Sequence, residues 1–279
     1  MTGRVAVVTG GTRGIGLETA SGLSRAGFDV IVVGRDGDRG LDACRTIRDR
    51  TGRDATFLAA DLSLLAEVRR VAEEIRQRLD VLYVLVNNAG HITRGRHVTE
   101  EGIESQLALN HVAPWLLSRE LLPSLVAGSP SSIVMVGAKA HHWGELDLDD
   151  LQSERSYNNG RVYGTTKLAM LMSTFAMARR LEGTRVRVNC LHPGILRTGF
   201  DVRAMNPVFP LFRFVFPGPR RGAANILRVA LSPDLEGVTG AWFEGDRRAT
   251  PSEQALDEDL QEKLWEATEK LAGPWRRGT

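Results

Sequence analysis

The sequence has little cysteine, few lysines and no long apolar run, and each shortage narrows the class of protein. Its two cysteines, Cys44 and Cys190, lie in no CxxC or Cys/His cluster, so we expect reduced thiols and no metal site. No apolar stretch reaches the ~18 residues of a membrane span, so stable membrane insertion is not expected. The net charge of +2 in 279 residues is too near zero to indicate electrostatic binding of nucleic acid, so no such partner is expected.

The N-terminal residues resemble no secretory signal. Residues 1–4 lead directly into an apolar segment at 5–8, and no basic segment precedes it, which predicts a cytoplasmic protein. Lysine occurs only at positions 139, 167, 263 and 270, while arginine supplies the other basic side chains. Because arginine codons are rich in G and C, this bias points to a GC-rich bacterial genome.

What the chain does have is an ordinary globular composition, with 42% hydrophobic and 25% charged residues. Short apolar runs alternate with helical patterns, as in a parallel sheet with crossover helices. We expect one α/β domain over residues 1–279, a doubly wound Rossmann-type fold with about seven central parallel strands and helices on both faces. The expected strands are residues 5–8, 30–33, 56–59, 81–86, 133–136, 186–191 and 241–244. The expected helices are residues 14–26, 41–50, 63–79, 99–109, 111–127, 162–181, 222–231 and 252–272.

One segment breaks the alternation. Residues 205–219 read MNPVFPLFRFVFPGP, rich in Pro and Phe and without clear periodicity. We interpret residues 200–219 as a substrate lid or pocket wall. A packed insertion without a ligand role and a membrane contact are the alternatives. The segment is too short and too broken to span a bilayer. The last helix, at 252–272, is amphipathic.

A glycine-rich turn joins the first strand to the first helix. Residues 9–16 read TGGTRGIG, with glycines at 10, 14 and 16. Glycines there allow a tight turn and a close backbone approach, and the helix N-terminus offers free N–H groups to a pyrophosphate. Plain turns also use glycine, but a strand before and a helix after favour dinucleotide binding.

Three further motifs follow in order: residues 87–90 read NNAG, Tyr163 and Lys167 form YxxxK, and Pro193-Gly194 follows the sixth strand. Together with the GxxxGxG turn, they resemble the short-chain dehydrogenase/reductase family over nearly the whole chain. The segments LNHVAP, AHHWG and LHPG resemble its retinol-dehydrogenase-like branch most, which does not by itself imply a retinoid substrate.

The resemblance implies a set of cofactor-binding residues. Asp61-Leu62 matches the pair that contacts adenine, although Asp61 or Ser63 could equally cap a helix. Residues 87–90 match the turn beside which the cofactor passes, and Pro193-Gly194-Ile195 with Thr198 match the loop around the nicotinamide. The implied cofactor-binding residues are Gly10, Thr12, Arg13, Gly14, Ile15, Gly16, Arg35, Asp61, Leu62, Asn88, Ala89, Gly90, Tyr163, Lys167, Pro193, Gly194, Ile195 and Thr198.

The end of the second strand bears on the choice between NAD(H) and NADP(H). NAD-selective enzymes usually place a carboxylate there, but this chain has Gly34 followed by Arg35. Arg35 and Arg13 could bind a 2′-phosphate with two guanidinium groups. Asp36 complicates this interpretation because it could neutralise Arg35. We favour NADP(H).

Tyr163 and Lys167 are the predicted catalytic pair. Four helical residues advance about 400°, so the two side chains lie about 40° apart on one face. The resemblance makes Tyr163 the proton donor for carbonyl reduction, and Lys167 the cation that draws the phenol pKa downward. Asn110 matches the asparagine that holds the lysine through water and joins a proton relay. A polar residue that kinks a helix is the alternative for Asn110, and we interpret His111 as a packing residue.

The family's catalytic serine is missing. Gly137 and Ala138 occupy the positions where the family usually has two serines, and Ala138 aligns with the one that hydrogen-bonds the substrate carbonyl. Losing such a donor costs about 10²–10³ in rate. A substitute donor (Lys139, His141, His142 or Ser156), a polarising group on the substrate, different or no chemistry, or engineered replacements could each explain the change.

The leading hypothesis is NADPH-dependent reduction of a ketone or aldehyde on a bulky apolar substrate, which a tailoring enzyme of bacterial secondary metabolism would fit. The alternatives keep NADP(H) binding but use Tyr163 for isomerisation, dehydration or cyclisation, or make the protein a non-catalytic NADP(H) sensor. A homodimer through residues 111–127 and 162–181 is a further expectation, which the last helix or the insertion could block. The predicted pocket residues are Lys139, His141, His142, Trp143, Phe200, Phe209, Phe212 and Phe214.

Overall fold

The computed structural model describes residues 3–194 and 218–275. Eight strands form one sheet in the order β3-β2-β1-β4-β5-β6-β7-β8. Seven are parallel, and β8 adds a two-residue antiparallel edge, so the predicted doubly wound sheet is confirmed. The strands are β1 (Val5–Thr9), β2 (Asp29–Gly34), β3 (Ala55–Ala59), β4 (Val84–Asn87), β5 (Ser131–Val136), β6 (Val186–His192), β7 (Ala241–Glu244) and β8 (Arg247–Arg248).

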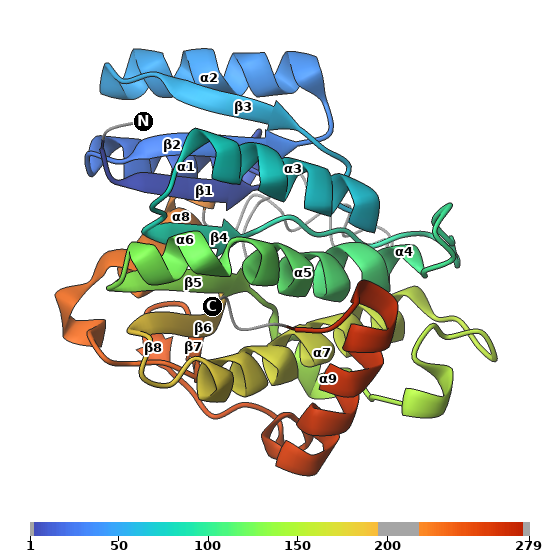
Figure 1. Ribbon diagram of the computed structural model, residues 1–279. Helices are drawn as coiled ribbons and strands as arrows, with labels where there is room; N and C mark the ends of the chain where they lie inside the picture. Colours follow the sequence, from blue (N-terminus) through green and yellow to red (C-terminus); the bar gives the residue numbers. More distant parts are fainter. Residues whose placement is uncertain (1–2, 195–217, 276–279) are drawn as a thin grey trace.

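Helices cover both faces of this sheet (Figure 1). The α-helices are α1 (Gly14–Arg25), α2 (Gly37–Thr51), α3 (Leu65–Arg78), α4 (Ser105–Leu107), α5 (Ala113–Glu120), α6 (Leu122–Ala127), α7 (Asn159–Arg180), α8 (Pro219–Leu231) and α9 (Glu258–Ala272). Shorter turns are the π-helical η1 (Ala108–Val112) and the 3₁₀ turns η2 (Lys139–Trp143), η3 (Leu148–Asp150), η6 (Pro233–Leu235) and η7 (Glu253–Leu256).

Alternating side chains of the strands build two cores. In β1, Val5 and Val7 face the core shared with α3, α5, α7 and α9, whereas Ala6 and Val8 face α1, α2 and α8. Both sets are buried, which explains why the strands appear as unbroken apolar runs. The carboxyl ends of the parallel strands therefore meet at one edge, where a doubly wound fold places its ligands.

Several predicted boundaries are wrong, each for a local reason. The expected helix at 99–109 is reduced to α4, because Gly102 adopts φ 78° and Val98 bridges Glu104 instead. The expected helix at 111–127 begins inside η1 and breaks between α5 and α6 near Pro123. The fourth strand begins at Val84 rather than at 81.

Two helix starts also differ from the expectation. α3 begins at Leu65, and neither Asp61 nor Ser63 caps it. Its free N–H groups at Leu65 and Ala66 donate to the carboxylate of Glu101, 2.5 and 2.8 Å away. The predicted helix at 252–272 divides into η7 and α9, because the Asp257 carboxylate accepts from the Leu260 N–H at 2.9 Å and starts a new helix.

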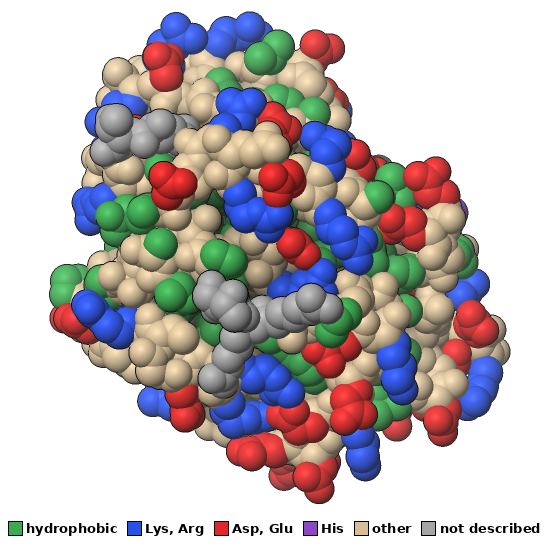
Figure 2. Space-filling view, viewed as in Figure 1, with side chains coloured by type: hydrophobic (Ala, Val, Ile, Leu, Met, Phe, Trp, Pro, Cys, Tyr) green, Lys and Arg blue, Asp and Glu red, His purple; other side chains and the backbone are tan. Residues whose placement is uncertain are grey.

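The last helix packs against α7, and its Trp265 contacts Trp115 of α5 at a ring-centroid distance of 5.2 Å. α9 thus covers part of the surface through which a homodimer was expected. Figure 2 shows acidic and basic side chains interspersed over this face of the molecule. Among the helices that the model describes, none is long and apolar enough to cross a membrane.

Candidate active site

The glycine-rich turn and the segment after β4 are joined by hydrogen bonds. The Thr9 hydroxyl accepts from the backbone N–H groups of Asn88 and Ala89 at 2.9 and 3.0 Å. In return, Asn88 Nδ2 donates to the Thr9 carbonyl at 2.9 Å. Thr9 is not among the residues that the sequence predicts for the site. The feature that could have indicated it is a hydroxyl at the end of β1, directly before the glycines.

The turn has the shape of a phosphate cradle. A Cβ at Gly16 would lie 2.2 Å from the Gly10 carbonyl oxygen, so only glycine allows this close packing. Gly14 has φ 56°, and a Cβ there would meet nothing within 4 Å. The N-terminus of α1 has no side-chain cap and no acidic residue in its first turn. These residues fit a dinucleotide, because the free N–H groups and the open space at Gly14 suit a diphosphate.

Of the two predicted phosphate-binding arginines, Arg35 directly follows β2 and has the acidic neighbour Asp36, whereas Arg13 lies in the glycine-rich turn. Asp36 does not pair with Arg35: it accepts from the Arg39 N–H at 3.1 Å, caps α2 and contacts the Arg39 guanidinium. Arg35 instead lies 3.6 Å from Asp61. Arg13 is exposed at the start of α1. The anticipated neutralisation of Arg35 by Asp36 is therefore absent.

Asp61 has a structural role, whereas its contact with the adenine stays a prediction. Its carboxylate accepts from the Ser63 N–H and hydroxyl at 3.0 and 2.7 Å. Partial burial raises the pKa of Asp61, but these hydrogen bonds and the Arg35 charge outweigh it and hold the pKa below its usual value. The Leu62 side chain is buried in the core, so only its backbone could face a cofactor.

Other predicted cofactor residues lie along the same edge of the sheet. Ile15 packs against the core behind α1. Thr12 lies close to Gly34: a Cβ built at Gly34 would be 2.9 Å from the Thr12 methyl group. Gly194 has φ 108°, and the Pro193 carbonyl accepts from Asn225 of α8 at 3.0 Å. Ile195, Thr198, Phe200, Phe209, Phe212, Phe214 and nearly all of the predicted lid lie outside the described residues.

Tyr163 and Lys167 are both buried on α7, Tyr163 against Ile92 and Ala140 and Lys167 against the end of β5. Tyr163 is 9% exposed, and Lys167 is 4% exposed, with its Nζ 5.8 Å from the centre of the Tyr163 ring. Burial raises the Tyr163 pKa above its ordinary value. The predicted lowering of this pKa by Lys167 is therefore not found in the protein without cofactor, because loss of hydration dominates.

Lys167 is held close to the end of β5. Its Nζ donates to the Val136 carbonyl at 3.0 Å, and burial lowers its pKa to about 8. A Cβ built at Gly90 would lie 3.5 Å from Lys167 Nζ and 3.1 Å from Asn110 Oδ1. Gly90 thus lies next to two predicted catalytic side chains, and a Cβ at this position would press against Asn110.

Asn110 lies in the π-turn η1 and is fully buried. Its Oδ1 accepts from the His91 N–H at 2.9 Å, and its Nδ2 donates to the His91 carbonyl at 2.9 Å and to Thr166 Oγ1 at 3.1 Å. Asn110 therefore joins the segment after β4 to α7. His91 and Thr166 are partners that the sequence did not reveal, because they are distant in the chain.

Ala138 lies beside Tyr163. It packs against the apolar cluster of Ile92, Ala140 and Tyr163 and has an extended backbone, with φ −153° and ψ 151°. Serine adopts this conformation readily, so the backbone does not explain the alanine. Gly137 differs: a Cβ there would lie 2.6 Å from Cys190 Sγ and 3.0 Å from the Trp242 ring. The larger neighbours fill the space that a serine at 137 would need.

The substitute donors are directed elsewhere. His141 Nε2 accepts from the Ser252 N–H at 3.3 Å, so its Nδ1 carries the proton and donates to the Ala138 carbonyl at 2.9 Å. Lys139 pairs with Glu244 at 2.5 Å, and the Ser156 hydroxyl accepts from Arg161 at 2.6 Å. Both ring nitrogens of His141 therefore already have partners, which disfavours His141 as the substitute donor.

The two remaining pocket predictions lie near the surface. His142 stacks on His141 at 4.0 Å and is 3.9 Å from Glu244. Trp143 is 55% exposed, and a Cβ at Gly164 would lie 2.8 Å from its ring, so it packs on the second turn of α7 at the residue after Tyr163. Within residues 3–194 and 218–275, no group of three His, Cys, Asp or Glu side chains could hold a metal ion.

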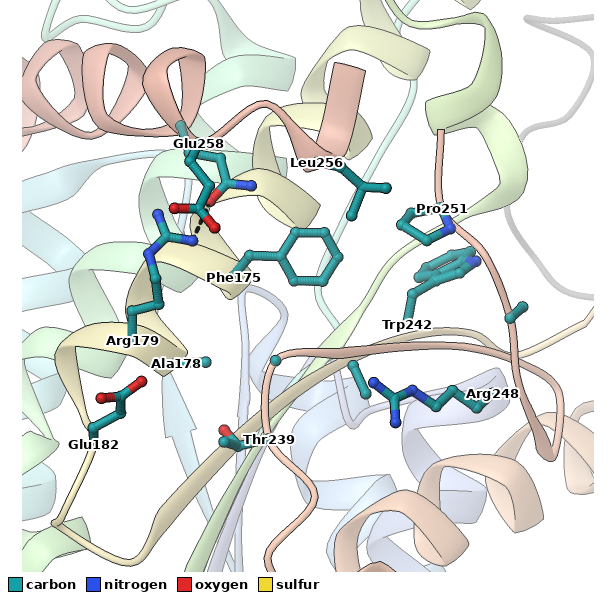
Figure 3. Close-up of a pocket in the computed structure, with 14 residues that line it drawn as sticks. Phe175, Ala178, Arg179, Glu182, Thr239, Trp242, Arg248, Pro251, Leu256 and Glu258 are labelled. Carbon is teal, nitrogen blue, oxygen red and sulfur yellow. Dashed lines mark hydrogen bonds between the residues drawn. The ribbon is translucent and has the colours of Figure 1, made fainter. Parts of the chain in front are cut away.

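A cleft of about 350 Å³ lies apart from this site, between α7, the start of β7 and the segment before α9. Figure 3 shows Trp242, Pro251 and Leu256 on one side of it, Arg179 and Glu182 on the other, and Phe175 between the two groups. Arg179 is already bonded to Gln261 and Glu262 at 2.6 and 2.9 Å. The cleft contains none of the residues predicted for catalysis.

The chain belongs to the short-chain dehydrogenase family, whose model matches residues 4–206. It is similar to mouse retinol dehydrogenase 14, with 38% identity over 98% of this chain and 87% of that protein, and to mouse polyprenol dehydrogenase, with 37% identity over 97% and 84%. Its fold is similar to that of an uncharacterised protein from Mycobacterium paratuberculosis, with a TM-score of 0.77, 28% identity, and coverage of 96% and 93% of the two chains.

These likenesses confirm the family and the retinol-dehydrogenase-like branch, and they support an oxidoreductase. Family membership implies a nicotinamide dinucleotide as cofactor. The described site can hold such a cofactor at the glycine turn and offers a phenol, an ammonium and an amide beside it. This combination suits proton transfer to a substrate oxygen.

Proposed function

We propose that this protein reduces a ketone or aldehyde on a bulky apolar substrate with NADPH. The observation that carries the proposal is the buried arrangement of Tyr163, Lys167 and Asn110 beside the open glycine turn. The retinol and polyprenol in the names of the related dehydrogenases are long apolar alcohols, which supports an apolar carbonyl as substrate class.

In this mechanism Tyr163 gives its phenol proton to the carbonyl oxygen. When bound, the nicotinamide supplies the hydride. The raised pKa of Tyr163 keeps the phenol protonated at neutral pH, which suits reduction and disfavours alcohol oxidation. Lys167 stabilises the phenolate that forms, and Asn110 keeps the segment after β4 next to α7.

The preference for NADP(H) is part of the proposal. Arg35 and Arg13 are the cations at the ribose end of the cradle, and Asp36 is occupied by the α2 cap and Arg39. Asp61 pairs with Arg35, whose side chain is 67% exposed, while that of Asp61 is 35% exposed. A 2′-phosphate can replace this weak surface pair with a charge-assisted one.

With the serine position occupied by Ala138, we propose that the substrate supplies part of the polarisation of its own carbonyl. The test compares NADPH and NADH consumption with retinaldehyde, an isoprenoid ketone and a ketone that carries a neighbouring hydroxyl. NADPH-dependent formation of the alcohol supports the proposal. Product formed without net NADPH oxidation would favour isomerisation, dehydration or cyclisation, and cofactor binding without turnover would favour a sensor.

The tailoring role, the cytoplasmic location and the homodimer stay predictions.

A further inference from the structure

His111, the residue next to Asn110, connects the π-turn to the C-terminal helix. It is 1% exposed, and its Nε2 lies 2.9 Å from the hydroxyl of Thr268 on α9. The Thr268 hydroxyl gives its own proton to the Leu264 carbonyl at 2.8 Å, so it can only accept from the imidazole. Burial lowers the His111 pKa to about 3, which keeps the ring neutral and this donor in place at working pH.

The π-turn decides where Asn110 points. The Ala113 N–H donates to the Ala108 carbonyl, five residues earlier, so one extra residue is accommodated between α4 and α5. Return to an α-helical register would rotate the neighbouring residues by about 100°. Asn110 and His111 point to different neighbours from this turn, the first to His91 and Thr166 and the second to Thr268.

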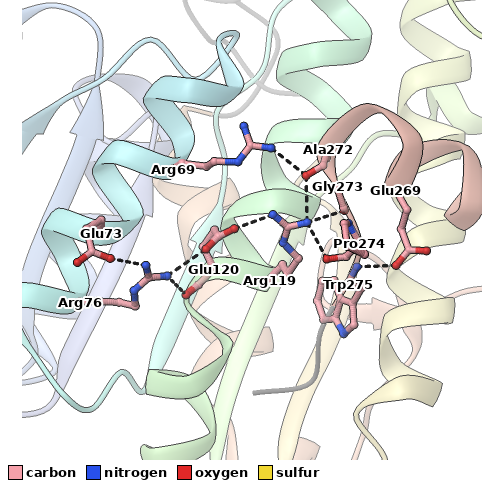
Figure 4. Close-up of polar contacts among 10 residues, drawn as sticks. All are labelled: Arg69, Glu73, Arg76, Arg119, Glu120, Glu269, Ala272, Gly273, Pro274 and Trp275. Carbon is pink, nitrogen blue, oxygen red and sulfur yellow. Dashed lines mark hydrogen bonds and ion pairs between the residues drawn. The ribbon is translucent and has the colours of Figure 1, made fainter. Parts of the chain in front are cut away.

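The helix that carries Thr268 is itself firmly attached. Trp115, Trp265 and Trp275 contact one another edge to face, with ring centroids 5.0–5.2 Å apart. Arg119 donates to the carbonyls of Ala272, Gly273 and Pro274 at 3.0, 2.5 and 3.0 Å, as Figure 4 shows. The Ala272 carbonyl also accepts from Arg69 at 2.9 Å, so two arginines bind the carbonyls at the end of this helix. α9 therefore offers Thr268 as a fixed acceptor.

We propose that His111 and Thr268 are positioning residues. They hold the π-turn in register from the side opposite to the Asn110 contacts. They thereby couple the C-terminal helix to proton transfer. Asn110 is hydrogen-bonded to the segment after β4 and to α7, whereas His111 is hydrogen-bonded to α9, so the turn is held between two supports. The inference rests on the proposed reduction for its kinetic effect, but the hold on the turn can be measured without it.

The test uses the full-length protein with Thr268→Val and Thr268→Ser. Valine matches threonine in shape but leaves the Nε2–H of His111 buried without an acceptor, whereas serine keeps the hydroxyl. We expect Thr268→Val to lower kcat about tenfold with KM and the NADPH dissociation constant within about twofold, and Thr268→Ser to keep wild-type kcat. An unchanged kcat in Thr268→Val, where the wild type reduces a carbonyl, would overturn the inference.

Asp257→Ala is the matched control, because it removes the N-cap of the same helix without touching the π-turn. It should lower Tm and leave kcat within about twofold. An equal loss of kcat in this variant would show that α9 acts only through general stability. Amide hydrogen exchange in residues 108–113 is the second readout: it should be faster in Thr268→Val than in Asp257→Ala. Equal exchange overturns the inference, and this readout decides it even if the wild type reduces no carbonyl.

Discussion

The two sides of the candidate site are built in different ways. On the α7 side, Lys167 and Asn110 are buried and hydrogen-bonded to the Val136 carbonyl, His91 and Thr166. On the β5 side, Gly137 and Ala138 offer no hydroxyl, and the polar neighbours Lys139 and His141 are bonded elsewhere. In the proposed reduction, the protein therefore fixes the groups for proton transfer closely and leaves polarisation of the substrate carbonyl to other groups, the substrate itself among them.

The largest expected effect breaks the α7 side. Tyr163→Phe removes the proton donor and keeps the ring that packs against Ile92 and Ala140. We expect kcat for carbonyl reduction to fall by about 10³-fold, in the range typical of a lost general acid, with the NADPH dissociation constant unchanged. Steady-state kinetics and fluorescence titration measure the two quantities. A variant that keeps wild-type turnover would remove Tyr163 from the mechanism.

The reverse experiment completes the β5 side. Ala138→Ser places a hydroxyl beside Tyr163 on a backbone that serine tolerates. For a simple ketone we expect kcat to rise by up to about 10²-fold, because one oxyanion donor is worth about this much. For a ketone with its own neighbouring hydroxyl the gain should be small. Equal gains on both substrates would show that substrate polarisation plays no part.

The choice between NADPH and NADH tests whether the residues expected around the cofactor ribose are as specific in their contacts as those on the α7 side. Arg35→Ala should raise KM for NADPH by about 10- to 100-fold and leave KM for NADH nearly unchanged, since it removes a charged hydrogen bond worth about 1.5–3 kcal/mol. Arg25→Ala, at the far end of α1, is the control. Parallel losses with both cofactors would argue against a role in phosphate selection.

The pH profile sharpens the role of Lys167. Burial lowers its pKa to about 8, so the ammonium is present below that pH and lost above it. We expect kcat/KM for reduction to be level below about pH 8 and to fall about tenfold per pH unit above it. The kcat/KM that remains in Lys167→Arg should stay constant up to a higher pH than in the wild type, because a guanidinium stays protonated. If kcat/KM of this variant falls at the same pH as that of the wild type, the titrating group is not Lys167.

The smallest effect concerns stability. Gly137→Ser introduces a side chain where Cys190 Sγ and the Trp242 ring leave no room, at 2.6 and 3.0 Å from the new Cβ. We expect a loss of about 1–3 kcal/mol in the free energy of unfolding, whereas Ala138→Ser should change it little. Chemical denaturation measures both. Equal stability of the two variants would contradict the packing argument.

The two sides also differ in how far the sequence predicts them. Glycine turns, strand runs and the Tyr163–Lys167 spacing are local patterns, and the structure confirms the sheet they predict. The contacts of Gly137 with Cys190 and Trp242, the Glu101 cap and the bonds of His141 join segments far apart in the chain. Periodicity and spacing carry no information on such contacts, so the sequence shows the missing hydroxyls of the β5 side but not the contacts around them.

Isotope transfer tests the central claim most directly. NADPH carrying deuterium at the transferable C4 position, incubated with retinaldehyde or an isoprenoid ketone, should give an alcohol with deuterium on the carbinol carbon. The Tyr163→Phe variant should give almost none. An unlabelled product from the wild type, or equal labelling by the variant, would contradict reduction by hydride transfer with Tyr163 as the proton donor.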